Sequence, residues 1–431
     1  MPNSASTPVP LPLTSNQKRG FWAAWAGWAL DGMDSFIYAL VMLPALRELL
    51  PRSGVSATTD ELGKYGGLLF ALFLVGWGCA FVWGPVADRF GRVRTLMLTV
   101  FWYSAFTFAG ATAGNVWQLA LFRLLAGMGI GGEWAMGGTL VAEEWPERLR
   151  VWGAALMHTG YYVGILIAAA ANYTIGMRFG WRAMFALGGT PALFLALLRR
   201  GLKEPERWRR RGNRAGPGAL REDGLRELFS PALRSRTLVS SSLLLVAIVG
   251  LWAGSVYVPA SVSILAVREG MAATGEIASY ATMLLAVATI IGCLLLPAMA
   301  DRWGRRGSVA FYFLLMMIFI PLAFGYCFYL PHHALLWFTV CLFFLGVGGA
   351  SFAVFTLWLP EQFPTSCRAS GFAFATSVGR FAGAGITFLV GWMISRFHTL
   401  GVPIALTSVA FLFGLALLPL ARETRGRPLP E

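Results

Sequence analysis

Long apolar stretches separated by short polar turns make up most of this 431-residue chain. Two of them, Thr95–Val116 and Ser308–Pro331, contain no charged residue. A helix of about 20 apolar residues is long enough to cross the roughly 30 Å hydrocarbon core of a bilayer. A chain in lipid must satisfy its backbone hydrogen bonds within each segment, so the pattern predicts transmembrane helices.

The same pattern predicts twelve transmembrane helices in two sets of six. The first set is expected at about Phe21–Pro44, Tyr65–Ala87, Thr95–Ala113, Trp117–Ala142, Val151–Ile175 and Ala183–Leu198. The second set is expected at about Thr237–Val267 (with a break near Pro259), Ile277–Ala300, Ser308–Leu330, Ala334–Leu359, Ala369–Ser395 and Pro403–Ala421. The predicted fold class is therefore an all-α polytopic membrane protein.

Composition divides the chain into five parts. We expect a disordered tail over residues 1–19 and an N-terminal six-helix half over residues 20–198. A basic linker over residues 199–236 is expected to join it to a C-terminal six-helix half over residues 237–421, and a short basic tail over residues 422–431 follows. The linker is interpreted as a solvated basic surface that faces anionic lipid.

Two pairs of polar turns show that the halves are related by duplication. The turn GPVADRFGRVR, Gly84–Arg94, returns as PAMADRWGRR, Pro297–Arg306. The turn that follows predicted helix 4, EEWPERLR, is echoed after helix 10 by PEQFPTSCR. Both copies of each turn fall on the same side of the membrane, so the halves are parallel repeats. Such repeats are typical of transporters with a site between the halves near the bilayer midplane.

Charge and cysteine content narrow the function further. Only 13% of the residues are charged, against about a quarter in soluble domains, and 57% are hydrophobic. The net charge of +14 arises from Lys and Arg that fall mostly on one side of the predicted membrane. This positive-inside pattern places both termini in the cytoplasm and argues against nucleic-acid binding. The five cysteines show no disulfide or metal spacing, and no nucleophile–base set indicates an enzyme, so we expect no cofactor or metal.

The first repeated turn fits the pattern G-x-x-x-D-R-x-G-R-[RK] of the major facilitator superfamily, which the sequence resembles over essentially its whole length. Val93 departs from the last position, although Arg94 follows, and Pro297 replaces the glycine in the second copy. RLLAGMGIGGEW, GWRAMFALGGTPAL and EPERW resemble organic-acid:proton symporters, particularly the sialate- and carboxylate-transporting branch. The segment Asp31–Asp34, DGMD, is similar to the aromatic-acid branch.

The resemblance implies that the repeated turns stabilise the conformation closed to the cytoplasm. Topology determination is a simpler role that these turns also fit. The expected gating residues are Gly84, Asp88, Arg89, Gly91, Arg92, Asp301, Arg302, Gly304 and Arg305.

Charged residues within spans are costly and suggest function. Asp31 and Asp34 share a face of helix 1. Two close carboxylates in a low dielectric cannot easily both ionise, so one is expected to accept a proton near neutral pH. Asp34 is preferred, since related sugar transporters carry an acid at the matching place. The alternative is structural: an arginine partner, or a cap for a kink at Gly32.

Helix 4 carries Arg123 and Glu133, nearly three turns apart. The resemblance implies that Arg123 pairs with a helix 1 acid and that protonation breaks the pair; a permanent brace is the alternative. Glu133 is interpreted as a proton relay or as a structural hydrogen-bonding acid.

Arg380 in helix 11 is the candidate anion site. No acid is predicted within helices 7–12, and a guanidinium binds a carboxylate with two parallel hydrogen bonds. The alternative is a pair with Asp31 or Glu133. The side chains expected to line the same cavity are His158, Tyr161, Tyr162 and Tyr257. The many Phe and Trp side chains are expected to be mostly lipid-facing or interfacial.

Together these features predict a proton-coupled symporter that imports a small organic anion, a carboxylate, by alternating access. The alternatives are a proton-antiport exporter of metabolites or drugs and a sugar or polyol carrier. The expected partners are the organic anion, the proton and the lipid bilayer, and the expected form is a monomer in the bacterial inner membrane.

Overall fold

The computed structural model describes residues 13–190, 203–206, 208–209, 224–255, 257–271, 274–397 and 399–431. Within these ranges every regular element is a helix. The end of predicted helix 6 from residue 191 and half of the predicted linker lie outside the described residues, as does the tail over residues 1–12.

The first half of the molecule contains six long helical segments. Their elements are α1 (Ser15–Arg52), α2 (Thr59–Gly78), η1 (Cys79–Val82), α3 (Trp83–Phe90), α4 (Arg92–Gly110), α5 (Val116–Glu144), α6 (Arg150–Ala171), η2 (Asn172–Gly176) and α7 (Met177–Gly189). The short helix α10 (Gly224–Leu228) follows in the predicted linker.

The second half is built from corresponding segments. Its elements are α11 (Arg234–Ser255), α12 (Val258–Arg268), α13 (Thr274–Ile320), η4 (Pro321–Tyr326), η5 (Cys327–Tyr329), α14 (Ala334–Gly349), α15 (Ser351–Gln362), α16 (Arg368–Phe397), α17 (Gly401–Leu406), α18 (Val409–Leu417) and η6 (Leu418–Leu420). Helix 7 is in two pieces, as predicted, with Pro259 in the first turn of α12. Predicted helices 8 and 9 form one element, α13, which turns at Gly304 (φ 75°).

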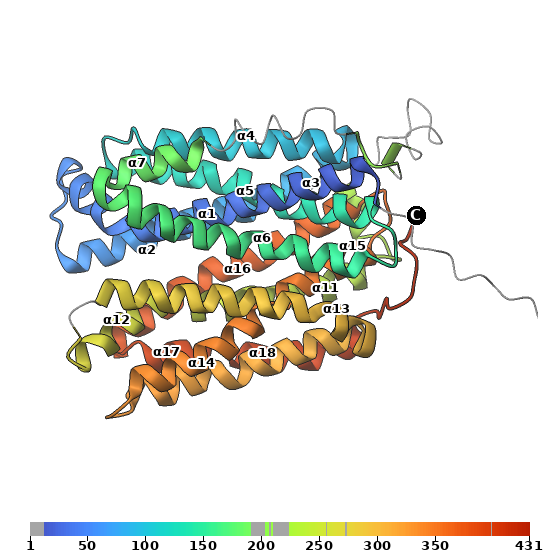
Figure 1. Cartoon of the computed structure of the whole chain (residues 1–431). Coiled ribbons are helices and arrows are strands. Elements are labelled where there is room, and N and C mark those ends of the chain that lie inside the picture. Colours follow the sequence, from blue (N-terminus) through green and yellow to red (C-terminus); the bar gives the residue numbers. More distant parts are fainter. Residues whose placement is uncertain are drawn as a thin grey trace, which may run out of the picture.

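The two halves lie side by side along a common axis, the first half above the second in the view of Figure 1. One end of the bundle collects the turns at Gly91, Trp145, Gly304 and Phe363, together with the C-terminal residues (Figure 1). We call it the charged end. Seven described helical stretches are long and apolar enough to cross a membrane.

Helix α1 is longer at both ends than the apolar run predicted. It begins at Ser15, inside the expected tail, because Thr14 and Gln17 form a reciprocal capping box. It also continues through Pro44 to Arg52. Ala45, Leu46, Leu49 and Leu50 are fully buried beyond that proline, and this packing maintains the helix.

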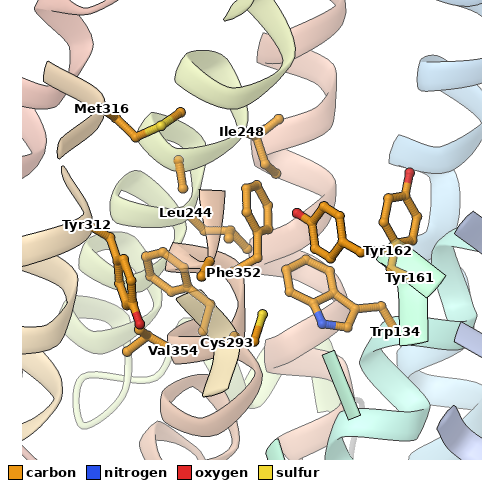
Figure 2. Packing of buried hydrophobic residues seen from close by; sticks show 14 of the residues in the cluster. Trp134, Tyr161, Tyr162, Leu244, Ile248, Cys293, Tyr312, Met316, Phe352 and Val354 are labelled. Atoms are coloured by element: carbon orange, nitrogen blue, oxygen red, sulfur yellow. The ribbon is translucent and has the colours of Figure 1, made fainter. Parts of the chain in front are cut away.

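Seven tryptophans of the described residues are buried, against the expectation that most aromatic residues face lipid or its interface: Trp28, Trp77, Trp83, Trp134, Trp145, Trp181 and Trp358. Trp28, Trp77 and Trp134 are almost completely buried in the main core cluster, part of which Figure 2 shows. Space for Trp77 comes from Gly131 of α5, where an added Cβ would lie 2.5 Å from the Trp77 backbone oxygen. The small residues of GMGIGG therefore allow α5 to approach α2 closely.

Candidate functional site

An ion pair joins α1 and α5 in the interior of the first half. Arg123 Nη1 lies 3.5 Å from Asp34 Oδ2, and both side chains are fully buried. Arg123 Nη2 also donates to Thr107 Oγ1 at 3.2 Å. The rings of Tyr38, Phe73 and Phe185 surround the guanidinium, the nearest centroid at 4.8 Å. Because water is excluded, loss of either charge would leave the other without compensation.

Asp31, one turn before Asp34, lies near Tyr161 of α6. The Tyr161 hydroxyl is beside Ser35 and within electrostatic range of Asp31 and Asp34. Gly32 makes this approach possible, since an added Cβ would lie 2.0 Å from the Tyr161 backbone oxygen. The helix is continuous through Gly32.

Arg380 of α16 is the buried cation of the second half, with 3% of its surface exposed. Its guanidinium lies over the ring of Trp77 at 4.1 Å and near that of Trp134 at 5.4 Å, so a second-half charge rests on first-half aromatics. It donates one hydrogen bond, to the Thr376 backbone oxygen at 3.2 Å. Within the described ranges, Nε has no hydrogen-bond partner.

The alternative ion pairs for Arg380 are not formed in this structure. Asp31 and Tyr161 are within electrostatic range of the guanidinium. No ion pair within 4.0 Å joins it to an acid among the described residues. Glu133 instead accepts a hydrogen bond from Thr99 Oγ1 at 3.4 Å, inside the first half. The guanidinium keeps hydrogen-bonding capacity for an anion.

His158 takes part in a polar contact between the halves. Its Nδ1 lies 3.3 Å from Thr356 Oγ1 on α15, and Trp134 Nε1 donates to the same hydroxyl at 2.8 Å. Phe352 stacks on the imidazole with ring centroids 6.2 Å apart. Trp134 therefore reaches from the Arg380 guanidinium to the Thr356 hydroxyl.

The two remaining tyrosines occupy different places. Tyr162 lies next to Tyr161 (Figure 2), with ring centroids 5.6 Å apart. Its hydroxyl is near Thr289 and Cys293 of α13. Tyr257 is half-buried at the break between α11 and α12 and packs against the main core cluster. The central site thus collects His158, Tyr161 and Tyr162, but the described contacts do not bring Tyr257 to it.

The first repeated turn contacts the opposite half at the charged end. Asp88 Oδ2 accepts hydrogen bonds from the backbone N–H (2.9 Å) and the hydroxyl (2.6 Å) of Ser370 on α16. Gly84 permits this contact, because an added Cβ would lie 2.6 Å from Ser370 Cα. Gly91 turns the chain with φ 112°, a conformation suited to glycine.

Two acids, one from each repeat, organise the buried charges at this end. Glu143 binds Arg92 of its own half at 3.2 Å and Arg368 of the other half at 2.7 Å. Glu361 binds Arg305 of its own half at 2.8 Å and Arg150 of the other half at 3.3 Å. Each acid therefore links its own repeated turn to the opposite half. The charged-end cluster comprises Asp88, Arg92, Glu143, Arg150, Arg305, Glu361, Arg368 and Ser370.

The second repeated turn is only partly equivalent to the first. Asp301 and Arg302 are exposed, and Arg89 is exposed in the first copy as well. Pro297 stands where Gly84 allows close approach in the first half, and a proline ring would not fit such a backbone contact. Of the nine expected gating residues, Asp88, Arg92 and Arg305 supply cluster charges, and the glycines shape the turns.

Some residues of these sites were not selected by sequence reasoning. The echo of EEWPERLR in PEQFPTSCR marked Glu143, Arg150, Glu361 and Arg368 as a repeat, but their exchange between halves depends on the tertiary structure. Trp77, Trp134 and Thr356 carried no sequence signal, because they stand in apolar runs like many others.

Replacing Asp88 with asparagine is expected to slow transport about tenfold with little effect on substrate affinity. Hydrogen bonds to a charged group each contribute about 1.5–3 kcal/mol, so the Ser370 contact would weaken without change near Arg380. Initial uptake rates over a range of substrate concentrations test this. Ser370→Ala removes one of the same bonds from the other side and should act alike. If Asp88→Asn weakened substrate affinity but left the maximal transport rate unchanged, the gating role of Asp88 would be contradicted.

Paired helical halves, buried charges between them and an ion-pair cluster at one end are features of a secondary transporter. The chain belongs to the Major Facilitator Superfamily, whose family model matches residues 24–386. It is an integral multi-pass membrane protein with a transport function and is not an enzyme.

The similar proteins agree with this assignment. A probable 4-methylmuconolactone transporter of Cupriavidus pinatubonensis is 30% identical over 423 residues, covering 95% of this chain and 91% of the relative. The niacin transporter NiaP of Acinetobacter baylyi is 25% identical, with 97% of each chain covered. The structure of the proton:xylose symporter XylE bound to 6-bromo-6-deoxy-D-glucose superposes with a TM-score of 0.81 at 19% identity, covering 96% of this chain and 98% of XylE. The common fold has twelve transmembrane helices.

Proposed function

We propose that this protein is a proton-coupled symporter that imports a small organic carboxylate by alternating access. The two buried arginines carry the argument. Arg123 has a carboxylate partner at 3.5 Å, whereas Arg380 has no ion pair within 4.0 Å among the described residues. Arg123 is thus proposed to belong to an internal switch, whereas Arg380 has, within the residues described, unused hydrogen-bond donors for a substrate anion.

Arg380 is the proposed binding site for the substrate carboxylate. A planar guanidinium presents paired N–H donors that match the two oxygens of a carboxylate. Its position over Trp77 and near Trp134 orients that plane through cation–π contact. His158, Tyr161 and Tyr162 supply polar groups around the same aromatic cluster. The site is therefore proposed to hold a carboxylate attached to a flat, unsaturated or aromatic group.

The relatives favour the same substrate class. Two relatives that match nearly the whole chain are named for 4-methylmuconolactone and niacin, and niacin is an aromatic carboxylic acid. Aromatic rings surround both groups: Trp77 and Trp134 lie against Arg380, and Trp28, Trp134, Tyr162 and Phe352 lie around His158. An aliphatic substrate would gain nothing from the stacking that these rings offer.

Asp34 is the proposed proton acceptor. Protonation of its carboxylate would break the pair with Arg123 and release a buried charge, which would bias the halves towards a new arrangement. Asp31 and Glu133 are proposed as secondary acids on the same route, and Tyr161 is within electrostatic range of both Asp31 and Asp34. A monoanion that enters with one proton carries no net charge, so the membrane potential would not oppose its uptake.

The charged-end cluster is the proposed inner gate. It holds the halves together through Asp88–Ser370, Glu143–Arg368 and Glu361–Arg150. The positive-inside distribution assigns this end, and both termini, to the cytoplasm of the bacterial inner membrane. The proposed cycle opens this cluster after proton and anion have bound from outside. We propose that the monomer is the working unit, with two six-helix halves joined by the linker over residues 199–236.

Uptake into proteoliposomes tests the function directly. Labelled nicotinate is the probe, with nicotinamide as a neutral analogue of the same shape and xylose as a substrate without an acid group. We expect nicotinate, or another aromatic carboxylate of a small panel, to accumulate only under an inward proton gradient. Transport of the neutral compounds in preference to every acid would contradict the anion assignment. Accumulation driven by an outward proton gradient would indicate an antiporter.

A further inference from the structure

The last residues of the chain run from the second half across the charged end towards the first half (Figure 1). Ala421, Thr424 and Leu429 of this segment are buried, the last with 3% of its surface exposed. We call residues 421–431 the C-terminal strap. An extended segment without helical hydrogen bonds needs other partners for its backbone groups, and those partners are well defined here.

The strap is fixed first to α15 and α13. The Arg422 backbone oxygen accepts hydrogen bonds from Trp358 Nε1 at 3.0 Å and Gln362 Nε2 at 3.1 Å. The Glu423 carboxylate accepts from the backbone N–H groups of Arg305 and Arg306. Burial alone would raise the pKa of Glu423, but its four backbone hydrogen bonds outweigh this and hold the pKa below its usual value. Glu423 thus remains ionised at neutral pH.

The strap then reaches the second-half members of both ion pairs between the halves. Thr424 Oγ1 donates to Glu361 Oε2 at 2.5 Å, and Glu361 is the acid that binds Arg150 of the first half. The Pro430 backbone oxygen accepts from Arg368 Nη2 at 2.5 Å, and Arg368 is the arginine that binds Glu143 of the first half. One short segment therefore touches both second-half residues that form ion pairs with the first half.

We propose that the C-terminal strap is a positioning element of the inner gate, which holds Glu361 and Arg368 in the conformations that reach across to Arg150 and Glu143. Long charged side chains lose considerable rotamer freedom when they form an ion pair. The strap removes that freedom in advance, because Thr424 and Pro430 fix the outer sides of the same two groups. Closure of the charged end then requires less ordering, so the strap favours the closed conformation.

The inference rests on the proposed alternating access in one respect only: that function is what gives the opening of the charged end a role in transport. It makes Thr424 and Leu429 gate residues. Leu429 contributes by burial, which keeps Pro430 against Arg368.

Spin-label distance measurements test the strap. Labels at Arg148→Cys and Asp301→Cys, exposed residues of opposite halves at the charged end, report its separation. They are placed in the full chain with the five native cysteines replaced by alanine, reconstituted into liposomes. Thr424→Val removes the bond to Glu361 without change in shape, and Leu429→Glu releases the end of the strap. Arg425→Gln is the matched control, because Arg425 is exposed and its side chain bonds the Arg302 backbone oxygen rather than Glu361 or Arg368.

Both strap variants are expected to increase the long-distance population several-fold, whereas Arg425→Gln should match the parent protein. Binding of nicotinate, or of the carboxylate identified by uptake, should stay near the parent affinity in Thr424→Val, which separates a shifted gate from general damage. Unchanged distance distributions in both variants would overturn the proposal. A further outcome is that the distance between the labels in the parent protein does not change with pH or added carboxylate while it increases in the variants. That result would support the strap but not the proposed transport cycle.

Discussion

Arg380→Ala is expected to abolish measurable uptake of the carboxylate substrate, with a loss of binding affinity on the order of a hundredfold. Truncating one partner of a buried, hydrogen-bonded charge pair costs roughly 2–5 kcal/mol, and about 3 kcal/mol corresponds to that factor. The loss should be specific to anions, because the aromatic surface formed by Trp77 and Trp134 would remain. Equilibrium binding to the purified transporter measures it, with nicotinate and nicotinamide compared in the same variant.

Two further variants sharpen this test. Arg380→Lys keeps the charge but loses the planar pair of donors, so intermediate affinity is expected. Arg396→Ala removes an exposed arginine near the end of the same helix and should leave binding unchanged. If Arg380→Ala binds the carboxylate as tightly as the parent protein, the anion site lies elsewhere. The uptake panel with the unmodified protein would still decide whether it is a carboxylate transporter.

Asp34→Asn is the second substitution with a large expected effect. It should abolish accumulation against a gradient while exchange of labelled for unlabelled substrate continues. Asparagine resembles the protonated acid in shape and charge, so it mimics one state of the cycle and cannot return to the other. Arg123 then lacks its ionised partner in every conformation, and the proton gradient no longer acts on the pair.

Parallel assays of accumulation and exchange separate the two expectations for Asp34→Asn. Asp34→Glu retains an ionisable group and should restore part of the accumulation. Glu276→Gln neutralises an exposed acid at the start of α13 and serves as the control for the change in charge. Accumulation at the parent level in Asp34→Asn would exclude this carboxylate as the coupling group. Loss of both accumulation and exchange, with no recovery in Asp34→Glu, would assign it the structural role considered above.

The aromatic core shows what apolar patterning leaves open. Trp28, Trp77 and Trp134 stand in runs that also contain lipid-facing residues, and a run that is apolar on every side has no face that the sequence marks as buried. Their positions depend on the rotation of α1, α2 and α5, which glycines such as Gly32 and Gly131 fix by close approach. Helix rotation is a property of the packed bundle, and it decided which aromatic side chains meet Arg380.

The charged end shows the same limit for the ion pairs. The echo of one turn in another indicated a duplication, but not that Glu143 reaches Arg368 or that Glu361 reaches Arg150. Nor did the motif distinguish Asp88, which contacts Ser370, from Asp301, which is exposed. Repeated sequences predict equivalent positions in each half, whereas the contacts between halves depend on how the two halves dock.

By itself, the sequence determined that this chain is a helical membrane transporter of the major facilitator type with an internal duplication. That information is local: apolar length, turn motifs and the side on which basic residues fall. The tertiary structure decided the partners. It placed Asp34 against Arg123, left Arg380 on tryptophan rings without an ion pair in the described part of the chain, and laid the C-terminal strap over the charged-end cluster. These contacts join residues far apart in sequence, so only the packing of one helix against another could define them.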